Sequence, residues 1–405
     1  MNPKTYCPMP FVTLTVNPGN YISRCMMSFR KMGPVSSETY SNDKFQTLRS
    51  NMLDGVWDEV GCDNCFTKEL QGLKSQRQKW LEKEQFYLGE SGIYKNNLSV
   101  SRNKIYHLYM NFSNICNFKC RMCGPHFSNA WINDYKKLNE QVSDLHIDKP
   151  LPPKQIVDVD KFLNEYGPEL SELRQIWITG GEPFMDNSVF EFFEKLENFF
   201  SLDKISVVVN TNASKIDVNK ISKLNKLKQI QINVSVDSVG DLYSYMRGFN
   251  FSFEELDKNV SMLSDLQSDQ HNLKLSINGA YQIYNILNVE DFFVWANSKV
   301  KDRCKYGYIE FRPLLNPNFL QARHAPAVLK QQSIEQIDRL LAQSPDNFYL
   351  KDVKKEVSKE QDTSKVQDFL RWNSTLDKIR NENLKDTFPE LFEEWIKEGI
   401  RFDVL

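Results

Sequence analysis

One stretch, residues 105–123, decides the fold, and it reads IYHLYMNFSNICNFKCRMC. Its first part, Ile105–Met110, is apolar and rich in strand-forming residues, and it predicts a β-strand. Cys116, Cys120 and Cys123 follow a few residues later with the spacing C-x3-C-x2-C. We therefore expect the three thiols on a loop at the carboxyl end of this strand, where barrel and open-sheet enzymes place their chemistry.

Strand and helix patterns alternate on the carboxyl side of this stretch. Strand-like runs lie at Gln175–Ile178, Ile205–Val209, Ile230–Val236, Leu273–Ile277 and Tyr308–Phe311, with helical patterns at Val189–Phe200, Phe253–Leu266 and Val289–Val300. This alternation predicts βαβ units, and hence an α/β fold with a parallel sheet. Six strands indicate a doubly wound sheet or an incomplete barrel rather than a closed barrel of eight.

Two further regions flank the alternating part. Residues 1–90 form a predicted small unit, with a hairpin whose strands flank Asn17–Asn20, a helix near Lys44–Leu53, and a charged helix from Cys65 to about Glu84. Residues 90–103 read as a linker. Residues 326–405 are predicted to be a helical extension, with helices at Ser333–Ala342, Lys365–Arg380 and Pro389–Gly399 and a solvated helix or loop at Lys351–Lys365.

Composition limits the classes of function. The chain has 405 residues, a formal charge of −2 and 40% hydrophobic residues, which excludes wholesale disorder. A near-neutral chain is not expected to bind nucleic acid through general electrostatics. Its mean hydropathy is −0.52, and no apolar run is long enough to cross a bilayer. The first residues lack a basic-then-apolar signal pattern, so we expect a cytoplasmic protein.

The cysteines indicate metal binding. Eight cysteines in 405 residues are too few for a disulfide scaffold, and clustered thiols in a cytosolic chain are typical of metal or redox sites. Cys116, Cys120 and Cys123, without a nearby fourth cysteine, suit a four-iron cluster with one open iron. The alternative is a zinc site in which His126 is the fourth ligand.

A second motif, Thr179-Gly180-Gly181-Glu182-Pro183, directly follows the next predicted strand. Paired glycines let backbone groups approach a ligand closely, and Glu182 adds a charged acceptor. Alone, the motif would be an ordinary turn from a strand to a helix that starts at Pro183.

Together, the cysteine triplet and the Gly-Gly-Glu-Pro motif resemble the two hallmark motifs of the radical S-adenosylmethionine (SAM) superfamily. The resemblance implies a partial (β/α)6 TIM-type barrel at residues 104–325 and a [4Fe-4S] cluster on the three cysteines. SAM would chelate the open iron, and Gly180, Gly181 and Glu182 would help to bind its methionyl amino group. One electron, from a donor such as flavodoxin or ferredoxin, would then release a 5′-deoxyadenosyl radical that abstracts a substrate hydrogen.

Other positions match this family less firmly. Met122 replaces the usual aromatic residue, and its thioether could pack on adenine. Asn212 resembles the family's Thr-Asn turn, and Ser235 with Asp237 its ribose-facing pair. Arg247-Gly248 resembles an Arg-Gly whose arginine pairs with the cofactor's carboxylate. The alternatives are a turn-stabilising Asn212, a buried strand serine and a surface arginine.

Four cysteines lie in the N-terminal unit: Cys7, Cys25, Cys62 and Cys65. Their spacing alone favours a structural zinc site. With Glu69, Gly72, Ser75 and Arg77, however, the segment resembles the auxiliary-cluster "twitch" or SPASM-like module, here placed before the barrel, which implies a second [4Fe-4S] cluster. The alternative for Ser75 and Arg77 is an ordinary charged helix.

Three residues are candidates for a pocket, namely Tyr281, Tyr284 and Arg312, and Cys304 is read as a buried thiol. No catalytic residue is assigned. We expect a radical SAM enzyme that acts on a peptide or protein. The alternatives are a carbohydrate, nucleotide or other small metabolite as substrate, or a non-catalytic iron–sulfur or metal-binding interaction protein.

Overall fold

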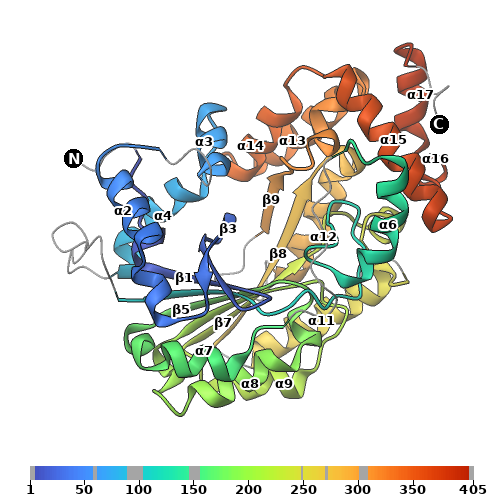
Figure 1. Ribbon diagram of the computed structural model, residues 1–405. Helices are drawn as coiled ribbons and strands as arrows, with labels where there is room; N and C mark the ends of the chain where they lie inside the picture. The colour runs from blue at the N-terminus through green and yellow to red at the C-terminus, as the bar shows by residue number, and fades with distance from the viewer. Residues whose placement is uncertain are drawn as a thin grey trace. The chain divides into compact units, whose positions relative to one another are not determined.

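The computed structural model describes residues 5–57, 62–88, 104–145, 156–247, 250–269, 272–300 and 309–400 (Figure 1). The predicted linker at 90–103, Gly248 and Cys304 lie outside the described residues. None of the described helices is long and apolar enough to cross a membrane.

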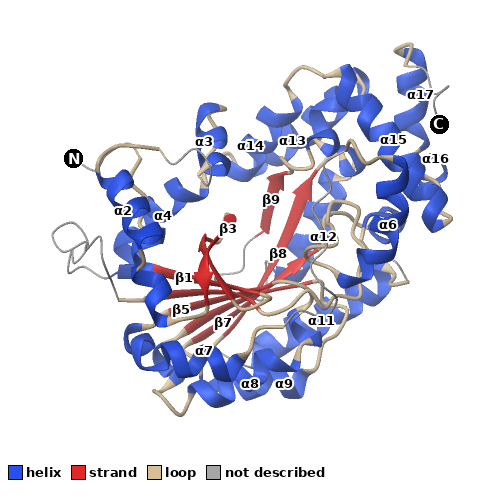
Figure 2. Ribbon diagram, viewed as in Figure 1, coloured by secondary structure: helices blue, strands red, loops and turns tan. Residues whose placement is uncertain are grey.

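A nine-stranded, mostly parallel sheet organises the chain, in the order β3-β2-β1-β4-β5-β6-β7-β8-β9 (Figure 2). The strands are β1 Thr13–Asn17, β2 Tyr21–Cys25, β3 Ser28–Pro34, β4 His107–Asn111, β5 Gln175–Thr179, β6 Ser206–Thr211, β7 Gln229–Ser235, β8 Leu273–Tyr281 and β9 Ile309–Pro313. All six strands expected on the carboxyl side of residue 104 are present, and the α/β prediction is confirmed. The partial barrel stays a prediction.

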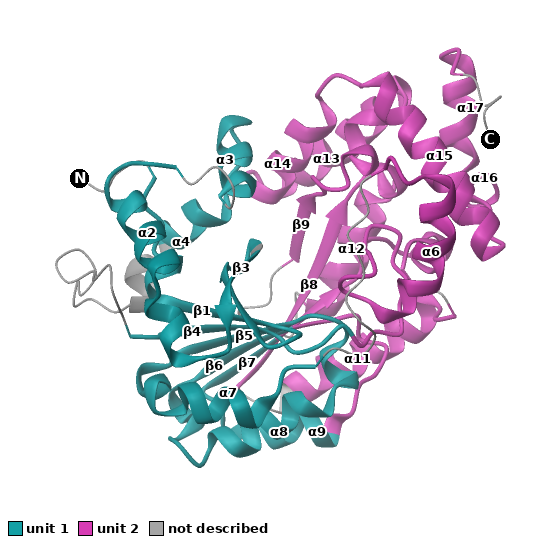
Figure 3. Cartoon of the chain, in the orientation of Figure 1, with its two compact units in different colours: residues 1–114, 154–209, 219–231 teal, residues 115–153, 210–218, 232–405 magenta. Residues whose placement is uncertain are grey.

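The chain divides into two compact units (Figure 3). Unit 1 comprises residues 1–114, 154–209 and 219–231, and unit 2 comprises residues 115–153, 210–218 and 232–405. Each unit is therefore assembled from separate segments of sequence. The domain boundaries expected from the sequence, at 1–90, 104–325 and 326–405, stay a prediction.

Unit 1 contains the expected hairpin, because β1 and β2 pair antiparallel with Thr15 opposite Ser23. The hairpin is not a sheet of its own. β1 also pairs in parallel with β4, with Thr13 opposite His107, and β4 continues in parallel to β5 and β6. All five residues of β1 are buried, as expected where both faces of a sheet are covered.

Helices of unit 1 follow or precede these strands. They are α1 Met9–Val12, α2 Asp43–Leu53, α3 Asp63–Leu70, α4 Gln76–Leu88, α7 Val159–Tyr166 and α8 Asn187–Leu196, with α9 Val218–Ser222 at the boundary of the units. The single charged helix predicted from Cys65 to Glu84 is wrong. The chain forms two helices, α3 and α4, because Gly72 adopts φ +68° between them, a left-handed conformation that ends a helix.

Unit 2 pairs β8 with β9 in parallel, with Ile277 opposite Ile309. Its helices are α6 Ile132–Gln141, α10 Asp241–Met246, α11 Phe253–Asp269, α12 Val289–Val300, α13 Ala327–Gln343, α14 Phe348–Val357, α15 Thr363–Arg380, α16 Leu384–Thr387 and α17 Pro389–Lys397. The expectation of a solvated helix or loop at Lys351–Lys365 is corrected by α14, which has a buried face. It starts at Phe348 behind the cap Asn347 and buries Leu350, Val353 and Val357.

Candidate metal and cofactor sites

The triplet loop of unit 2 is held by its own backbone and by one indole. Cys123 N donates to Cys120 O at 2.9 Å, which closes a tight turn between these two cysteines. Ser128 Oγ donates to Phe118 O at 2.7 Å, and Trp131 Nε1 donates to Cys120 O at 3.1 Å. None of the three cysteines is in a disulfide. The loop thus presents three thiols from one short, fixed segment.

Hydrogen-bond donors are directed at the first sulfur of this loop. Phe118 N lies 3.4 Å from Cys116 Sγ, and Asn212 Nδ2 lies 3.9 Å from the same sulfur. Burial raises the pKa of Cys120, so that this thiol needs a cation to hold it as a thiolate at neutral pH. Thiolate ligands with N–H donors to sulfur are what an iron–sulfur cluster uses, and the donor set fits such a group.

Asn212 stabilises a turn and also reaches the triplet loop. Its Oδ1 accepts from Ser214 N at 2.8 Å, while its Nδ2 lies 3.2 Å from Asn117 Oδ1. Asn117 in turn donates to Ser214 Oγ at 3.0 Å. Within unit 2 the structure therefore brings the predicted residue Asn212 to Cys116.

Arg247 and Asp237 form a buried ion pair in unit 2. Arg247 Nη1 lies 2.7 Å from Asp237 Oδ2, and the two side chains are 12% and 3% exposed. Burial opposes the charged guanidinium, but Asp237 and Cys120 outweigh it and raise the pKa of Arg247. The alternative of a surface arginine is therefore wrong. Asp237 also accepts from Ala280 N at 2.6 Å.

Two other predicted residues of unit 2 are half-buried and stay predictions as cofactor contacts: Ser235 at the end of β7, and Met122 in the triplet loop. His126 is also half-buried, with its ring 4.9 Å from that of Phe127. Among the described residues, no three His, Cys, Asp or Glu side chains are arranged to bind a single metal ion. The zinc alternative with His126 stays a prediction.

The Gly-Gly-Glu-Pro motif lies in unit 1, immediately after β5. Gly180 and Gly181 adopt φ of +85° and +57°, which favours glycine. A Cβ on Gly180 would lie 3.0 Å from Cα of Asn111 and from Ser113 O. Glu182 is 1% exposed and accepts from Phe184 N at 3.2 Å. The motif is thus a tight turn packed against the end of β4, with a buried carboxylate.

A chain of polar side chains crosses the carboxyl ends of three parallel strands in unit 1. Thr179 Oγ1 donates to Asn111 Oδ1 at 2.9 Å, and Asn111 Nδ2 donates to Asn17 Oδ1 at 2.7 Å. Sequence reasoning missed Asn17 and Asn111. Their signal was a buried asparagine as the last residue of each strand, which becomes meaningful only once β1 is known to pair with β4.

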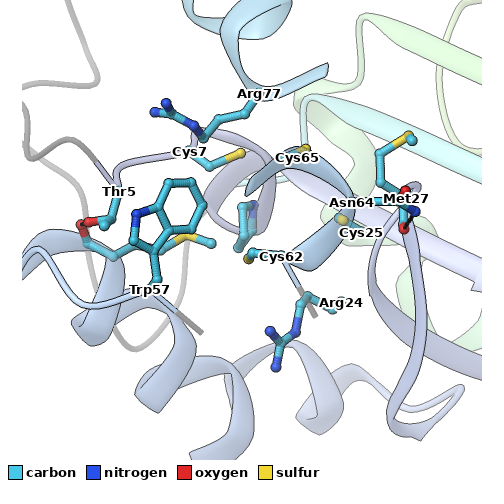
Figure 4. A pocket seen from close by; sticks show the side chains of 12 residues that line it. Thr5, Cys7, Arg24, Cys25, Met27, Trp57, Cys62, Asn64, Cys65 and Arg77 are labelled. Carbon is cyan, nitrogen blue, oxygen red and sulfur yellow. Dashed lines mark hydrogen bonds between the residues drawn. The ribbon is translucent and has the colours of Figure 1, made fainter. Parts of the chain in front are cut away.

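The four N-terminal cysteines line one cavity in unit 1. Figure 4 shows their side chains around a common space, with Trp57, Arg24 and Arg77 nearby. Burial raises the pKa of Cys7 and Cys65, and raises that of Cys25 from 9.0 to about 12. Backbone N–H groups of Met9, Arg77 and Met27, respectively, counteract this shift by hydrogen bonding to the sulfurs.

A buried network supports this cavity. Arg77 Nε lies 2.9 Å from Glu69 Oε1, Arg77 Nη1 donates to Tyr6 O at 2.8 Å, and Ser75 Oγ donates to Glu69 Oε1 at 2.5 Å. Ser75 is 0% exposed and Arg77 9%. The two side chains are therefore buried, whereas an ordinary charged helix would expose them.

The three candidate pocket residues divide into core and surface. Tyr281 OH lies 2.7 Å from Ser333 Oγ, and Tyr284 OH donates to Asn373 Oδ1 at 2.7 Å. Both tyrosines are fully buried, so they belong to the core of unit 2. Arg312 is 42% exposed and pairs with Glu310.

Comparison with known proteins identifies the central segment. Residues 110–279 match the model of the Radical SAM superfamily. This segment is a radical SAM domain. It contains the cysteine triplet, the Gly-Gly-Glu-Pro motif and Arg247.

A curated relative also matches part of the chain, over a length similar to that of this domain. GTP 3′,8-cyclase from Vibrio atlanticus (strain LGP32) is 26% identical over 182 residues, which is 41% of this chain and 48% of that protein. The chain therefore spans about half of the curated relative that it matches.

Two solved structures resemble the chain more distantly. Native anSMEcpe with bound AdoMet has a TM-score of 0.42 and 14% identity, and the match covers 60% of this chain and 61% of the anSMEcpe chain. SuiB of Streptococcus suis bound to S-adenosylmethionine has a TM-score of 0.39 and 15% identity, with 76% and 65% covered. These likenesses are too weak for a property of either protein to be transferred to the radical SAM domain.

Proposed function

We propose that the protein is a radical SAM enzyme in which Cys116, Cys120 and Cys123 hold a [4Fe-4S] cluster. The observation that carries this proposal is the triplet loop itself. Three thiols come from one fixed segment of a radical SAM domain, and two N–H donors approach the first sulfur. When bound, the cluster and SAM would supply a 5′-deoxyadenosyl radical that abstracts a substrate hydrogen.

The chain's own residues would bind and orient SAM. Gly180 and Gly181 lack side chains, so that the backbone groups of this turn would be accessible to the methionyl amino group. Glu182 would offer a carboxylate to the same amino group. Arg247, already charged and held by Asp237, would pair with the carboxylate. Asn212, Ser235 and Met122 would contact the nucleoside. A partial (β/α)6 barrel around the cofactor would keep water and other hydrogen donors away from the radical.

We also propose that the N-terminal cavity holds a second [4Fe-4S] cluster, as in a twitch or SPASM-like module. Four cysteines line one cavity, and four close thiolates can fully ligate either an iron–sulfur cluster or zinc. The resemblance to the auxiliary-cluster module favours the cluster. Zinc is the alternative metal.

The first candidate substrate is a peptide or protein, because the N-terminal module resembles the auxiliary-cluster modules of peptide-modifying enzymes. The second candidate is a small metabolite such as a nucleotide. One observation favours it, namely the relative named for a cyclisation of GTP. A flavodoxin or ferredoxin in the cytoplasm would supply the electron in either case.

Anaerobic turnover tests the proposal. Reconstituted protein, with dithionite and SAM, is expected to form 5′-deoxyadenosine, and the variant with Cys116, Cys120 and Cys123 all changed to Ala is expected to form none. If the wild-type protein forms no more 5′-deoxyadenosine than this variant, the result contradicts the enzyme proposal and favours a non-catalytic metal-binding protein. Metal analysis decides the second site: about eight irons per chain indicate two clusters, and about four with one zinc indicate the alternative.

A further inference from the structure

Arg121 lies between two of the proposed cluster ligands, yet its side chain is 0% exposed. Its Nε donates to Tyr245 O at 3.0 Å, and its Nη1 donates to Asn373 Oδ1 at 3.0 Å. Its Nη2 pairs with the carboxylates of Asp377 and Glu382. All three guanidinium nitrogens thus have partners. We call these five residues the Arg121 cluster.

The chemistry of this cluster requires an arginine. A buried cation is costly unless it is paired and hydrogen-bonded. Here the carboxylates of Asp377 and Glu382 supply the opposite charge. The guanidinium carbon also lies 3.6 Å from the ring centroid of Tyr245, which adds a cation–π contact. A lysine has one nitrogen and cannot reach all of these partners at once.

A second contact joins α15 to the same loop. Trp131 Nε1 donates to Cys120 O at 3.1 Å, and its ring stacks on that of Trp372 at 6.0 Å between centroids. Arg380, at the end of α15, lies over Trp131 at 4.5 Å and pairs with Asp134 at 2.9 Å. Through Trp131, α15 thus contacts the backbone of Cys120. Through the Arg121 cluster, it contacts the side chain of the next residue.

We propose that α15 and Glu382 position the cysteine triplet, with Arg121 as the positioning residue. This inference rests on the proposed function, because it concerns the cluster that the triplet would hold. Three partners of Arg121 come from residues 373–382, in the C-terminal part of the chain and outside the radical SAM match at 110–279. The C-terminal extension therefore has a role in the metal site, fixing the loop so that Cys116, Cys120 and Cys123 keep their ligating arrangement.

The test compares a graded series, Glu382→Gln, Asp377→Asn and Arg121→Lys, with wild type in the full chain. The readouts are the rate at which iron passes to an excess of chelator without oxygen, and the electron paramagnetic resonance spectrum of the reduced cluster with and without SAM. The triple-alanine variant identifies the iron that belongs to the N-terminal site. Loss of a residue that orients metal ligands typically weakens a site about 10–100-fold, and we expect the series to increase iron release from the triplet in that order.

Arg371→Gln is the matched control, since it removes an ion pair from the same helix. Arg371 pairs with Asp144 at 2.7 Å and 2.8 Å on the exposed side of α15, so triplet iron should be unaffected. If Asp377→Asn and Arg121→Lys release triplet iron at the same rate as Arg371→Gln, the inference is overturned and the proposed function is left intact. Equal loss from both metal sites, together with a lost fold by circular dichroism, also overturns it, because the effect is then global. Equal iron in wild type and the triple-alanine variant overturns the inference and the proposed function together.

Discussion

Arg247 Nη1 lies 2.7 Å from Asp237 Oδ2, and Asp237 reaches this position with a backbone φ of +70°. A left-handed conformation is uncommon for a residue other than glycine, although Asp and Asn tolerate it better than most. The ion pair is thus built on a constrained backbone in the radical SAM domain. Such local constraint is typical of functional positions.

Asp237→Asn should reduce the free energy of unfolding by about 3–5 kcal/mol, because it leaves the buried Arg247 charge without its partner. Asparagine tolerates the positive φ, so that the loss reports the charge rather than the backbone. Denaturant unfolding measures it. Asp144→Asn, which removes the exposed partner of Arg371, is the control and should change little. An unchanged midpoint in Asp237→Asn would contradict the buried pair.

Gly180→Ala should destabilise the protein by more than about 1 kcal/mol, because an L-residue in the left-handed region costs that much. The new Cβ would also lie 3.0 Å from Asn111 and Ser113 O. Gly124→Ala is a matched control beside Cys123, since its Cβ would meet nothing within 4 Å. Thermal unfolding compares the two. Equal transition temperatures would show that the turn after β5 has a different conformation.

Cys62→Ser with Cys65→Ser should remove the N-terminal metal but leave the triplet's iron and its ability to cleave SAM. Both cysteines line the N-terminal cavity, and metal sites of this kind need every thiolate. Iron, sulfide and zinc analysis of the purified variant, with a 5′-deoxyadenosine assay, measures the outcome. Unchanged metal content would rule out these two residues as ligands.

The metal-free protein should lose stability as the pH rises from about 9 towards 12. The pKa of Cys25 is raised from 9.0 to about 12, and that of Cys7 is also raised by burial. Unfolded thiols therefore release their protons at lower pH than folded ones, and the stabilisation present below pH 9 disappears as the pH increases.

Urea unfolding of apo protein across this pH range measures the effect. A Cys7→Ala, Cys25→Ala variant should show a smaller dependence on pH, since it lacks both shifted groups. A steeper dependence in that variant than in the parent would contradict the burial of these thiols.

The local pattern predicted most of the regular structure. The helix expected at Val289–Val300 is α12 with the same bounds, and the strand expected at Gln175–Ile178 is β5 with one more residue. Both have a strong periodic pattern and clear ends. The break at Gly72 was also visible as a glycine in a helical pattern, and the prediction of one helix passed over it.

Contacts between distant segments could not be predicted in this way. The pairing of β1 with β4 depends on which strand edges meet, and periodicity contains no information on that. Nothing in the sequence shows that Asp377 and Glu382 lie against Arg121. A buried ion pair becomes recognisable only when both partners are placed in space.

The parallel pairing of β1 with β4 affects how the protein is made. Thr13 lies opposite His107, so that the ribosome must synthesise helices α1 to α4 and all four N-terminal cysteines before β4, the parallel neighbour of β1, exists. Pairing between such distant segments is slow compared with local hairpin formation. The nascent chain thus carries all four N-terminal cysteines before β1 can pair with β4.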